Sequence, residues 1–311
     1  MSLAILCSGQ GPQHPGMFAL TGSVSVAADL FAHASTLLGG RDPRELVHSE
    51  TDDALHDNRT GQILCALQSL AAAVVLKNLR AGGLIVAGYS VGELAAWGVA
   101  DLIAPKTVLD LTARRAEVMD AASTAGDGLL FVRGLSRGVI DYLCERHDIA
   151  VAIVNPGDAF ALGGGCDALD AVAKDAEQRG AERVVRIGVK VAAHTQKLIK
   201  ASAAFRECLN GTAVAPNLSA GVRLFSGIDA APVLDIQTGL NKLADQISHT
   251  IQWSDCLAGC VEAGASAFFE LGPGRALVDM VTAVHPQIPA RSLEDFRTVE
   301  GVHAWLSRTT A

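Results

Sequence analysis

The chain has few aromatic residues and no run of basic residues. Phe, Trp and Tyr make up 5% of its 311 residues, and acidic residues outnumber basic ones to give a formal net charge of -8. Because a surface of that sign repels phosphates, we expect no nucleic acid among the partners. Alanine supplies much of the hydrophobic fraction, which is 50% of the chain. That composition favours helices packed closely on a sheet over an all-β sandwich.

The chain also lacks a segment that is long, apolar and uncharged enough to span a bilayer. Its first residues have neither the basic stretch nor the apolar core of a secretory signal. We therefore expect a cytoplasmic protein without a membrane partner.

The spacings of a metal site are absent too. The cysteines include no CxxC pair and have no neighbouring histidines, so we expect buried thiols and no metal. They are Cys7, Cys65, Cys144, Cys166, Cys208, Cys256 and Cys260. The last two could share a helix face, but two thiols without further ligands make a poor metal site.

The most informative segment is Gly88-Tyr89-Ser90-Val91-Gly92, in which a serine stands between two glycines. The apolar run 84–87 predicts a buried parallel strand before it, and Leu94 and Trp97 have helical spacing after it. This arrangement is typical of a nucleophile elbow, a sharp turn at which only glycine tolerates the crowding beside the serine. The Val91 N–H, at the start of the helix, is suited to hold a developing oxyanion. An ordinary glycine-flanked turn is the alternative.

The order of apolar segments predicts an α/β fold whose large part is an α/β-hydrolase-like domain with a parallel sheet. Its expected elements are the strand 3–7, the loop 8–13, the helices 62–80, 91–100 and 105–122, the helix 194–209, the strand 222–226, the helices 236–249 and 253–263, and the strand 267–271. The loop 8–13 is too polar and glycine-rich to continue the sheet, so we expect it to have a functional role.

Between these parts the order of elements changes. We predict the strand 128–132, the helix 136–147, the strands 149–154 and 159–163, the helix 167–179 and the strand 183–187. This βαββαβ order is that of a ferredoxin-like unit. The sequence therefore predicts a small ferredoxin-like subdomain over 125–189, inserted into a large catalytic domain formed by 1–124 and 190–311.

A serine nucleophile needs a base, and histidine is the side chain best suited to take and return its proton. Of the nine histidines, His194 stands between a strand end and a predicted helix, where loops usually carry catalytic groups. A helix-capping or packed histidine is the alternative there. His14, His249 and His285 stay ambiguous, and the others lie among charged residues or on exposed helix faces.

Further motifs follow one another over nearly the whole chain. They are Gly9-Gln10-Gly11 with Gln13, the elbow with Glu93, Arg115 with Met119, His194, Gln246 before Gln252-Trp253, and Glu270-Leu271-Gly272-Pro273-Gly274. In this order they resemble the malonyl-CoA:acyl carrier protein transacylases. Tyr89 departs from the histidine usual before the nucleophile, and Leu198 from a methionine found in many relatives. The elbow Gly-Tyr-Ser-Val-Gly-Glu, with Cys7-Ser8 in place of Phe-Pro, is most similar to the acyltransferase subunit of bacterial malonate decarboxylase.

The resemblance implies ping-pong acyl transfer with malonyl-CoA as the donor substrate and no permanently bound cofactor. Ser90 would attack the thioester, and His194 would take its proton and return one to the leaving thiolate. The backbone amides of Gln10 and Val91 would form the oxyanion hole. The acceptor would be the phosphopantetheine-type thiol of an acyl carrier protein, and other malonate decarboxylase subunits would be further partners.

The resemblance also implies roles for three other side chains. The family orients its histidine with a backbone carbonyl, which here matches Gln246. The residue that matches its clamp for the malonyl carboxylate is Arg115, and we expect Arg114 to face elsewhere. Asn155 would lie by the substrate channel, although a hairpin turn explains it equally well.

Two other functional classes stay open. A serine esterase or thioesterase shares the elbow but usually has an acidic third member, in the order serine, acid, histidine. A non-catalytic subunit could bind an acyl carrier without chemistry. Lys190, Lys197 and Lys200 could dock an acidic carrier, or they could form an ordinary solvated face.

Overall fold

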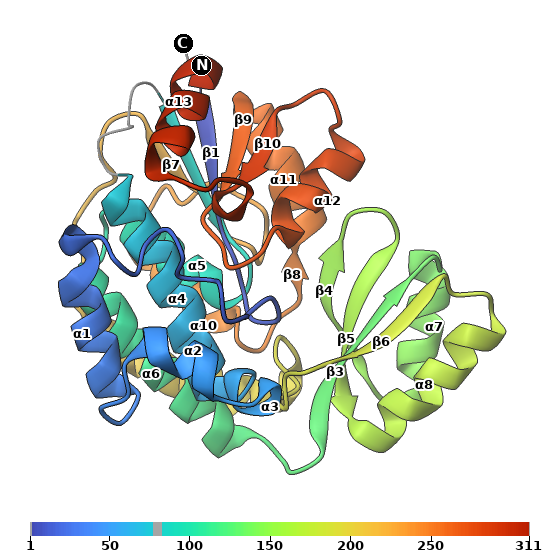
Figure 1. The fold of residues 1–311 in the computed structure, drawn as a ribbon. Helices are drawn as coiled ribbons and strands as arrows, with labels where there is room; N and C mark the ends of the chain where they lie inside the picture. The colour runs from blue at the N-terminus through green and yellow to red at the C-terminus, as the bar shows by residue number, and fades with distance from the viewer. Residues whose placement is uncertain (1, 77–82, 311) are drawn as a thin grey trace.

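The computed structural model describes residues 2–76 and 83–310 and contains two sheets (Figure 1), which we call the large sheet and the small sheet. The large sheet has the order β10-β9-β1-β2-β7, and all its strand pairs are parallel. Its strands are β1 (Ser2–Cys7), β2 (Gly83–Gly88), β7 (Val222–Leu224), β9 (Ala265–Glu270) and β10 (Ala290–Ser292). The predicted mixed α/β fold with a parallel sheet is therefore confirmed.

Helices pack around the large sheet, which explains why β1 and β2 are apolar and buried almost throughout. Helix α5 packs on β1 and β2, whereas α11, α12 and α13 pack on β9. The helices are α1 (Ala28–Leu37), α2 (Pro43–Ser49), α3 (Asp52–Leu55), α4 (Asn58–Val75), α5 (Val91–Val99), α6 (Pro105–Ala122), α9 (Ile199–Asn210), α10 (Ile236–Asp245), α11 (Trp253–Glu262), α12 (Ala276–Val284) and α13 (Val299–Thr310). None of the helices in the described ranges is both long and apolar enough to pass through a membrane.

The small sheet has the order β6-β3-β5-β4-β8. Its first four strands pair antiparallel, whereas β8 joins β4 in parallel. The strands are β3 (Asp127–Arg133), β4 (Ala150–Asn155), β5 (Ala159–Gly165), β6 (Arg183–Ile187) and β8 (Ile251–Gln252). Helices α7 (Arg137–His147) and α8 (Cys166–Gln178) lie on its outer face (Figure 1). From β3 to β6 the elements follow the βαββαβ order that the sequence predicts.

Each sheet has a hydrophobic core of its own. Leu6, Val86 and Phe268 belong to the core of the large sheet, whereas Leu130 and Leu162 belong to a separate cluster between the small sheet and its two helices. Strand β8 comes from the C-terminal part of the chain, yet it extends the small sheet. The sequence does not predict β8, because two residues are too few to give a periodic pattern.

Two predicted helix boundaries near the site are wrong. The helix expected over 194–209 begins only at Ile199, after a 3-10 turn, because Thr195 is extended with φ -129° and ψ 160°. The helix expected over 236–249 ends at Asp245, since the N–H groups of Ile247 and Ser248 bond back by three residues, to Ala244 and Asp245. The corrected boundaries place His194 on a loop and Gln246 at the end of α10.

Other corrections concern a helix start and two thiols. The helix predicted over 62–80 begins at Asn58, because the Asp57 side chain accepts from the Thr60 N–H and caps it. The predicted end of this helix lies outside the described residues. Cys166 is exposed and Cys208 is half-buried, contrary to the expectation of buried thiols, whereas the other five cysteines are buried.

Candidate active site

The serine of the elbow lies between the end of β2 and the start of α5. Ser90 has φ 56° and ψ -122°, a conformation that residues with a side chain rarely adopt. A Cβ added at Gly88 would lie 2.2 Å from the Glu93 nitrogen, and one at Gly92 would lie 2.1 Å from the Cys7 oxygen. Both glycines are therefore required by the close approach of backbone on either side of the serine.

His194 lies beside this serine, on the loop that follows β6. The Ser90 Oγ and the His194 Nε2 are 2.8 Å apart, and the His194 Nδ1 is 2.6 Å from the Gln246 carbonyl oxygen. Because a carbonyl only accepts, Nδ1 carries the proton, and Nε2 is left to accept from the serine hydroxyl. The structure thus brings together three residues that the sequence predicts for one site, and it makes the hydroxyl, imidazole and carbonyl a continuous hydrogen-bonded line.

The backbone of His194 is itself constrained. The residue has φ 62°, and its N–H donates to the Ile247 oxygen over 2.8 Å. Burial, and to a smaller extent the charge of Arg115, lower the pKa of His194 from its usual 6.5 to about 3. The imidazole is therefore neutral at physiological pH, as a proton acceptor must be.

Arg115 lies on α6 and is 1% exposed, whereas the neighbouring Arg114 is exposed and pairs with Glu117. The prediction that Arg114 faces elsewhere is confirmed. The Arg115 guanidinium donates to the Gln62 Oε1 over 2.7 Å and to the Gln246 Oε1 over 3.1 Å. Burial lowers the pKa of Arg115 to about 10, so it keeps its charge at neutral pH. Its hydrogen-bond partners are thus two neutral amides, and Arg115 is not among the residues that line the cavity at Ser90.

The loop after β1 runs close to the elbow. A Cβ at Gly9 would lie 2.7 Å from the Tyr89 oxygen and 3.4 Å from the Ser90 Cβ, so only glycine allows this approach. The next residue, Gln10, lines the cavity at Ser90. Val91 is the first residue of α5, so its N–H has no acceptor within the helix. The oxyanion roles of Gln10 and Val91 stay predictions.

Two adjoining cavities reach the site. A small one of about 90 Å³ is bordered by Ser90 and His194 and has apolar walls that include Met119 and Ala193. The larger one, of about 380 Å³, lies between the loop after β1, helix α12 and strands β3 and β6. The residues that line both cavities are Gln10, Tyr89 and Ile187. An elongated molecule could therefore extend from the larger cavity to the serine.

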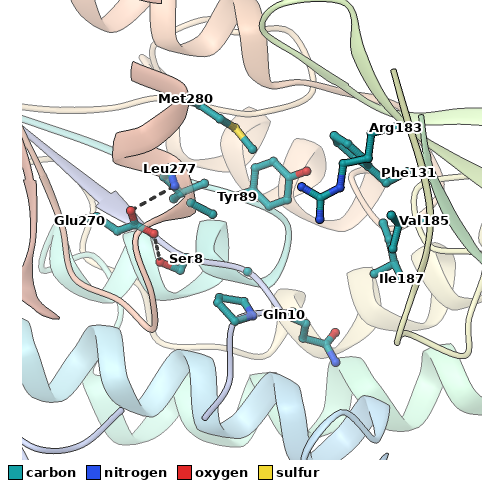
Figure 2. A pocket seen from close by; sticks show the side chains of 14 residues that line it. Ser8, Gln10, Tyr89, Phe131, Arg183, Val185, Ile187, Glu270, Leu277 and Met280 are labelled. Carbon is teal, nitrogen blue, oxygen red and sulfur yellow. Dashed lines mark hydrogen bonds between the residues drawn. The ribbon is translucent and has the colours of Figure 1, made fainter. Parts of the chain in front are cut away.

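Figure 2 shows how the walls of the larger cavity are arranged. The Tyr89 ring stands between Met280 and the Arg183 side chain, which reaches in from β6. On the opposite wall Glu270 accepts from the Ser8 hydroxyl over 2.7 Å and from the Leu277 N–H over 3.1 Å. The lining of the cavity is mainly apolar, and Arg183 and Glu270 are ionisable residues in it.

Asn155 is buried at the end of β4. Its side chain hydrogen-bonds Tyr89, whose pKa burial nevertheless raises to about 12. Tyr89, and not Asn155, is among the residues that line the two cavities. A role of Asn155 in the substrate channel stays a prediction.

Two of the three lysines near His194 pair with carboxylates. Lys190 lies 2.8 Å from Asp53, and Lys197 lies 3.0 Å from Asp127. Lys200 is exposed on α9. Within residues 2–76 and 83–310, no group of three or more His, Cys, Asp or Glu side chains could hold a metal ion.

Sequence reasoning assigned no role to Glu93 and Gln62, two buried residues that complete the site. Glu93 accepts from the Gln246 Nε2 over 2.7 Å and from the Gly227 N–H over 3.0 Å, and burial raises its pKa to about 7. Gln62 is a partner of Arg115. The sequence signal for Glu93 is its place directly after the elbow glycine Gly92. Its partner Gln246 is distant in sequence, so the hydrogen bond between them has no such signal.

A hydroxyl, an imidazole and a carbonyl in one hydrogen-bonded line are compatible with acyl transfer, and the comparison with protein families gives the class of protein. The acyl transferase domain family matches residues 5–273, and the chain belongs to that family. Within it the chain is similar to malonyl CoA-acyl carrier protein transacylases. That of Mycobacterium tuberculosis (strain ATCC 25618 / H37Rv) is 28% identical over 296 residues, covering 94% of this chain and 96% of that protein. That of Synechocystis sp. is 26% identical over 296 residues, covering 94% and 97%.

Solved structures agree on the fold. The crystal structure of MCAT from Mycobacterium tuberculosis is 27% identical, covers 100% of both chains and has a TM-score of 0.88. The malonyl CoA-acyl carrier protein transacylase from Coxiella burnetii has a TM-score of 0.90 at 23% identity, covering 100% of this chain and 98% of that one. Both the large and the small sheet thus fall within the shared architecture.

Proposed function

We propose that the protein moves a malonyl group from malonyl-CoA to the phosphopantetheine thiol of an acyl carrier protein, through an acyl-enzyme on Ser90. The observation that carries this proposal is the line from the Ser90 hydroxyl through His194 to the Gln246 carbonyl. The transacylases to which the chain is similar supply the substrate class.

In the first half-reaction the Ser90 oxygen attacks the thioester carbonyl while His194 Nε2 takes the hydroxyl proton. The carbonyl π electrons move to oxygen, which the amides of Val91 and Gln10 stabilise. When the tetrahedral intermediate collapses, the C–S bond breaks and the thiolate of coenzyme A leaves with the proton from His194. The second half-reaction reverses these steps, with the carrier thiol as the nucleophile.

Arg115 would select a dicarboxylic acyl group. A guanidinium offers parallel N–H groups to a carboxylate, and a buried one is worth more because water does not compete. The small cavity at Ser90 suits a short acyl group. The larger cavity between the two sheets would hold the pantetheine arm, with the predicted small subdomain 125–189 as one wall.

We further propose that the carrier is the one of malonate decarboxylase. This assignment rests on the elbow sequence Gly-Tyr-Ser-Val-Gly-Glu and on Cys7-Ser8. In both motifs the structure shows contacts of a distinguishing residue. Tyr89 packs edge-to-face on Trp253, and Ser8 bonds Glu270. Side-by-side assays with a fatty-acid carrier and a decarboxylase carrier would decide it, since faster transfer to the fatty-acid carrier contradicts this assignment.

The test of the main proposal is intact-protein mass after brief mixing with malonyl-CoA, for the wild type and Ser90→Ala. We expect a malonyl adduct on the wild type alone, discharged when an acyl carrier protein is added. Release of free malonate at the same rate with and without the carrier would instead establish the hydrolase alternative. If the wild type forms no adduct, the result would favour the alternative of a non-catalytic subunit that binds an acyl carrier.

A further inference from the structure

Arg115 carries a buried charge without a direct counter-charge. Its guanidinium donates to the side-chain oxygens of Gln62 and Gln246, and both are neutral. The carboxylate whose charge acts on Arg115 is that of Glu93, which does not touch the guanidinium directly but bonds the amide of Gln246. A buried cation of this kind is costly unless an anion nearby compensates it.

Glu93 is the nearest candidate for that anion, and it lies one amide group away. It is 1% exposed, on the first turn of α5. Its Oε2 accepts from the Gln246 Nε2 over 2.7 Å and from the Gly227 N–H over 3.0 Å. A Cβ at Gly227 would lie 3.0 Å from this oxygen, so a glycine there lets the backbone reach the carboxylate. The site therefore contains a built cradle for the Glu93 side chain.

The Gln246 side chain joins the two charges in one orientation. Its Oε1 faces the Arg115 guanidinium, which only donates, over 3.1 Å. Its Nε2 faces the Glu93 carboxylate and, over 3.1 Å, the Ser90 carbonyl, and both of these only accept. If the Gln246 amide were turned over, its NH₂ group would face the Arg115 guanidinium and its oxygen would face the Glu93 carboxylate. Neither contact could form a hydrogen bond. When it is ionised, Glu93 therefore helps the Ser90 carbonyl to fix the position of the oxygen that accepts from Arg115.

Resting on the proposed function, we propose that Glu93 is a positioning residue for malonyl transfer, which acts through the Gln246 amide to hold the Arg115 guanidinium ready for the acyl carboxylate. It balances the charge of Arg115 without occupying the N–H groups that the substrate needs. A direct ion pair would fill those groups and compete with the malonyl carboxylate.

A positioning role of Glu93 predicts different effects on malonyl and on acetyl transfer. An acetyl group has no carboxylate and does not need Arg115. His194 is held by the backbone carbonyl of Gln246 and not by its side chain, so the hydrogen bond between the imidazole and this carbonyl does not depend on Glu93. Loss of Glu93 is therefore expected to weaken malonyl transfer more than acetyl transfer.

The experiment compares Ser90 acylation by malonyl-CoA and acetyl-CoA at pH 8, where Glu93 is mostly ionised. The proteins are the wild type, Glu93→Ala, Glu93→Gln and Asp127→Asn. Asp127 is a matched control, because it is a buried carboxyl that pairs with Lys197, away from Gln246. Thermal melts establish that each variant is folded.

We expect Glu93→Ala to lower kcat/KM for malonyl-CoA by about 30-fold, mainly through KM, and that for acetyl-CoA by less than about threefold. For Glu93→Gln, kcat/KM for malonyl-CoA should lie between the values of the wild type and Glu93→Ala. The new amide oxygen can still accept from Gln246 and Gly227, but it carries no charge. Asp127→Asn should keep the wild-type ratio of malonyl to acetyl transfer.

A folded Glu93→Ala protein with the wild-type ratio would overturn the proposal, and so would an equal loss for both substrates, which is the mark of a packing role. If Glu93→Ala does not fold, an unchanged ratio in Glu93→Gln overturns it. If the wild type takes up no malonyl group, the proposed function itself is contradicted. The outcomes that overturn only the role of Glu93 all require a wild type that is malonylated.

Discussion

Tyr89 packs edge-to-face against Trp253, with ring centroids 5.3 Å apart and an interplanar angle of 87°. This contact joins the residue before Ser90 to the start of α11, next to β8. Transacylases of this family usually have a histidine at the position of Tyr89. In this chain an edge-to-face aromatic contact stands next to the elbow instead.

Tyr89→Ala should destabilise the protein, whereas Tyr89→Phe should not. Alanine removes the ring from Trp253, at a cost of about 3 kcal/mol in the free energy of unfolding. Phenylalanine keeps the ring and loses only the hydroxyl that Asn155 bonds, at a cost of about 1 kcal/mol. Urea denaturation of the three proteins would measure both values. Equal losses would show that the hydroxyl, and not the ring contact, matters.

Arg115→Ala should lower malonyl transfer about 100-fold, the equivalent of about 3 kcal/mol of transition-state binding. Transfer from acetyl-CoA should hold or rise, because the acetyl group has no carboxylate to bind. Arg115→Lys keeps the charge but cannot present two parallel N–H groups, so it should recover only part of the activity. Steady-state kinetics with both donors would measure this, and an equal loss for malonyl and acetyl would remove Arg115 from the clamp role.

The lowered pKa of His194 makes the stability of the protein depend on pH with a definite sign. The unfolded histidine titrates near 6.5 and the folded one near 3, so between these values the unfolded state binds more protons. The stability that the neutral His194 contributes is complete above pH 6.5 and is lost as the pH falls. From pH 7 to 5 the wild type should lose about 2 kcal/mol relative to His194→Gln.

Denaturant titrations of the wild type and His194→Gln at several pH values would measure this difference. Because both proteins carry the other titratable groups, those contributions cancel in the comparison. A difference that does not change between pH 7 and 5 would mean that the folded His194 titrates near its ordinary pKa.

Gly92→Ala should disrupt the elbow. The new Cβ would lie 2.1 Å from the Cys7 oxygen in the neighbouring strand, where neither backbone can move without breaking the sheet. We expect a loss of about 3 kcal/mol or more in the free energy of unfolding. Gly138→Ala is the matched control, because a Cβ there meets nothing within 4 Å, and its effect should stay below about 1 kcal/mol. Similar melting temperatures for the two variants would contradict the crowding at Gly92.

The sequence predicted the parallel sheet, the βαββαβ order and the turn at Ser90, because each depends on local patterns. Apolar runs such as 84–87 identify buried strands, and glycines beside a serine identify a crowded turn. Helix α6 begins and ends where the sequence predicts, since Pro105 marks its start. These features need no knowledge of distant contacts.

The partners of the site residues could not be predicted in this way. Gln62, Glu93 and Gln246 come from three different helices or helix ends, and nothing in the local sequence says that Arg115 and Gln246 connect them. The positive φ of His194 also lacks a local signal, because its N–H bond to the Ile247 oxygen comes from a segment distant in sequence. Tertiary contacts override helical periodicity there, which explains the wrong helix start at residue 194.

Strand β8 connects the small sheet to the backbone beside His194. A short segment leads from Gln246, whose carbonyl holds His194, to Ile251, which pairs with Ile153 of the small sheet. The same small sheet supplies Phe131 and Arg183 to the wall of the larger cavity. One short segment thus joins the sheet that forms a wall of the larger cavity to the carbonyl that accepts from His194. We therefore expect the width of this cavity and the position of the His194 ring to depend on each other.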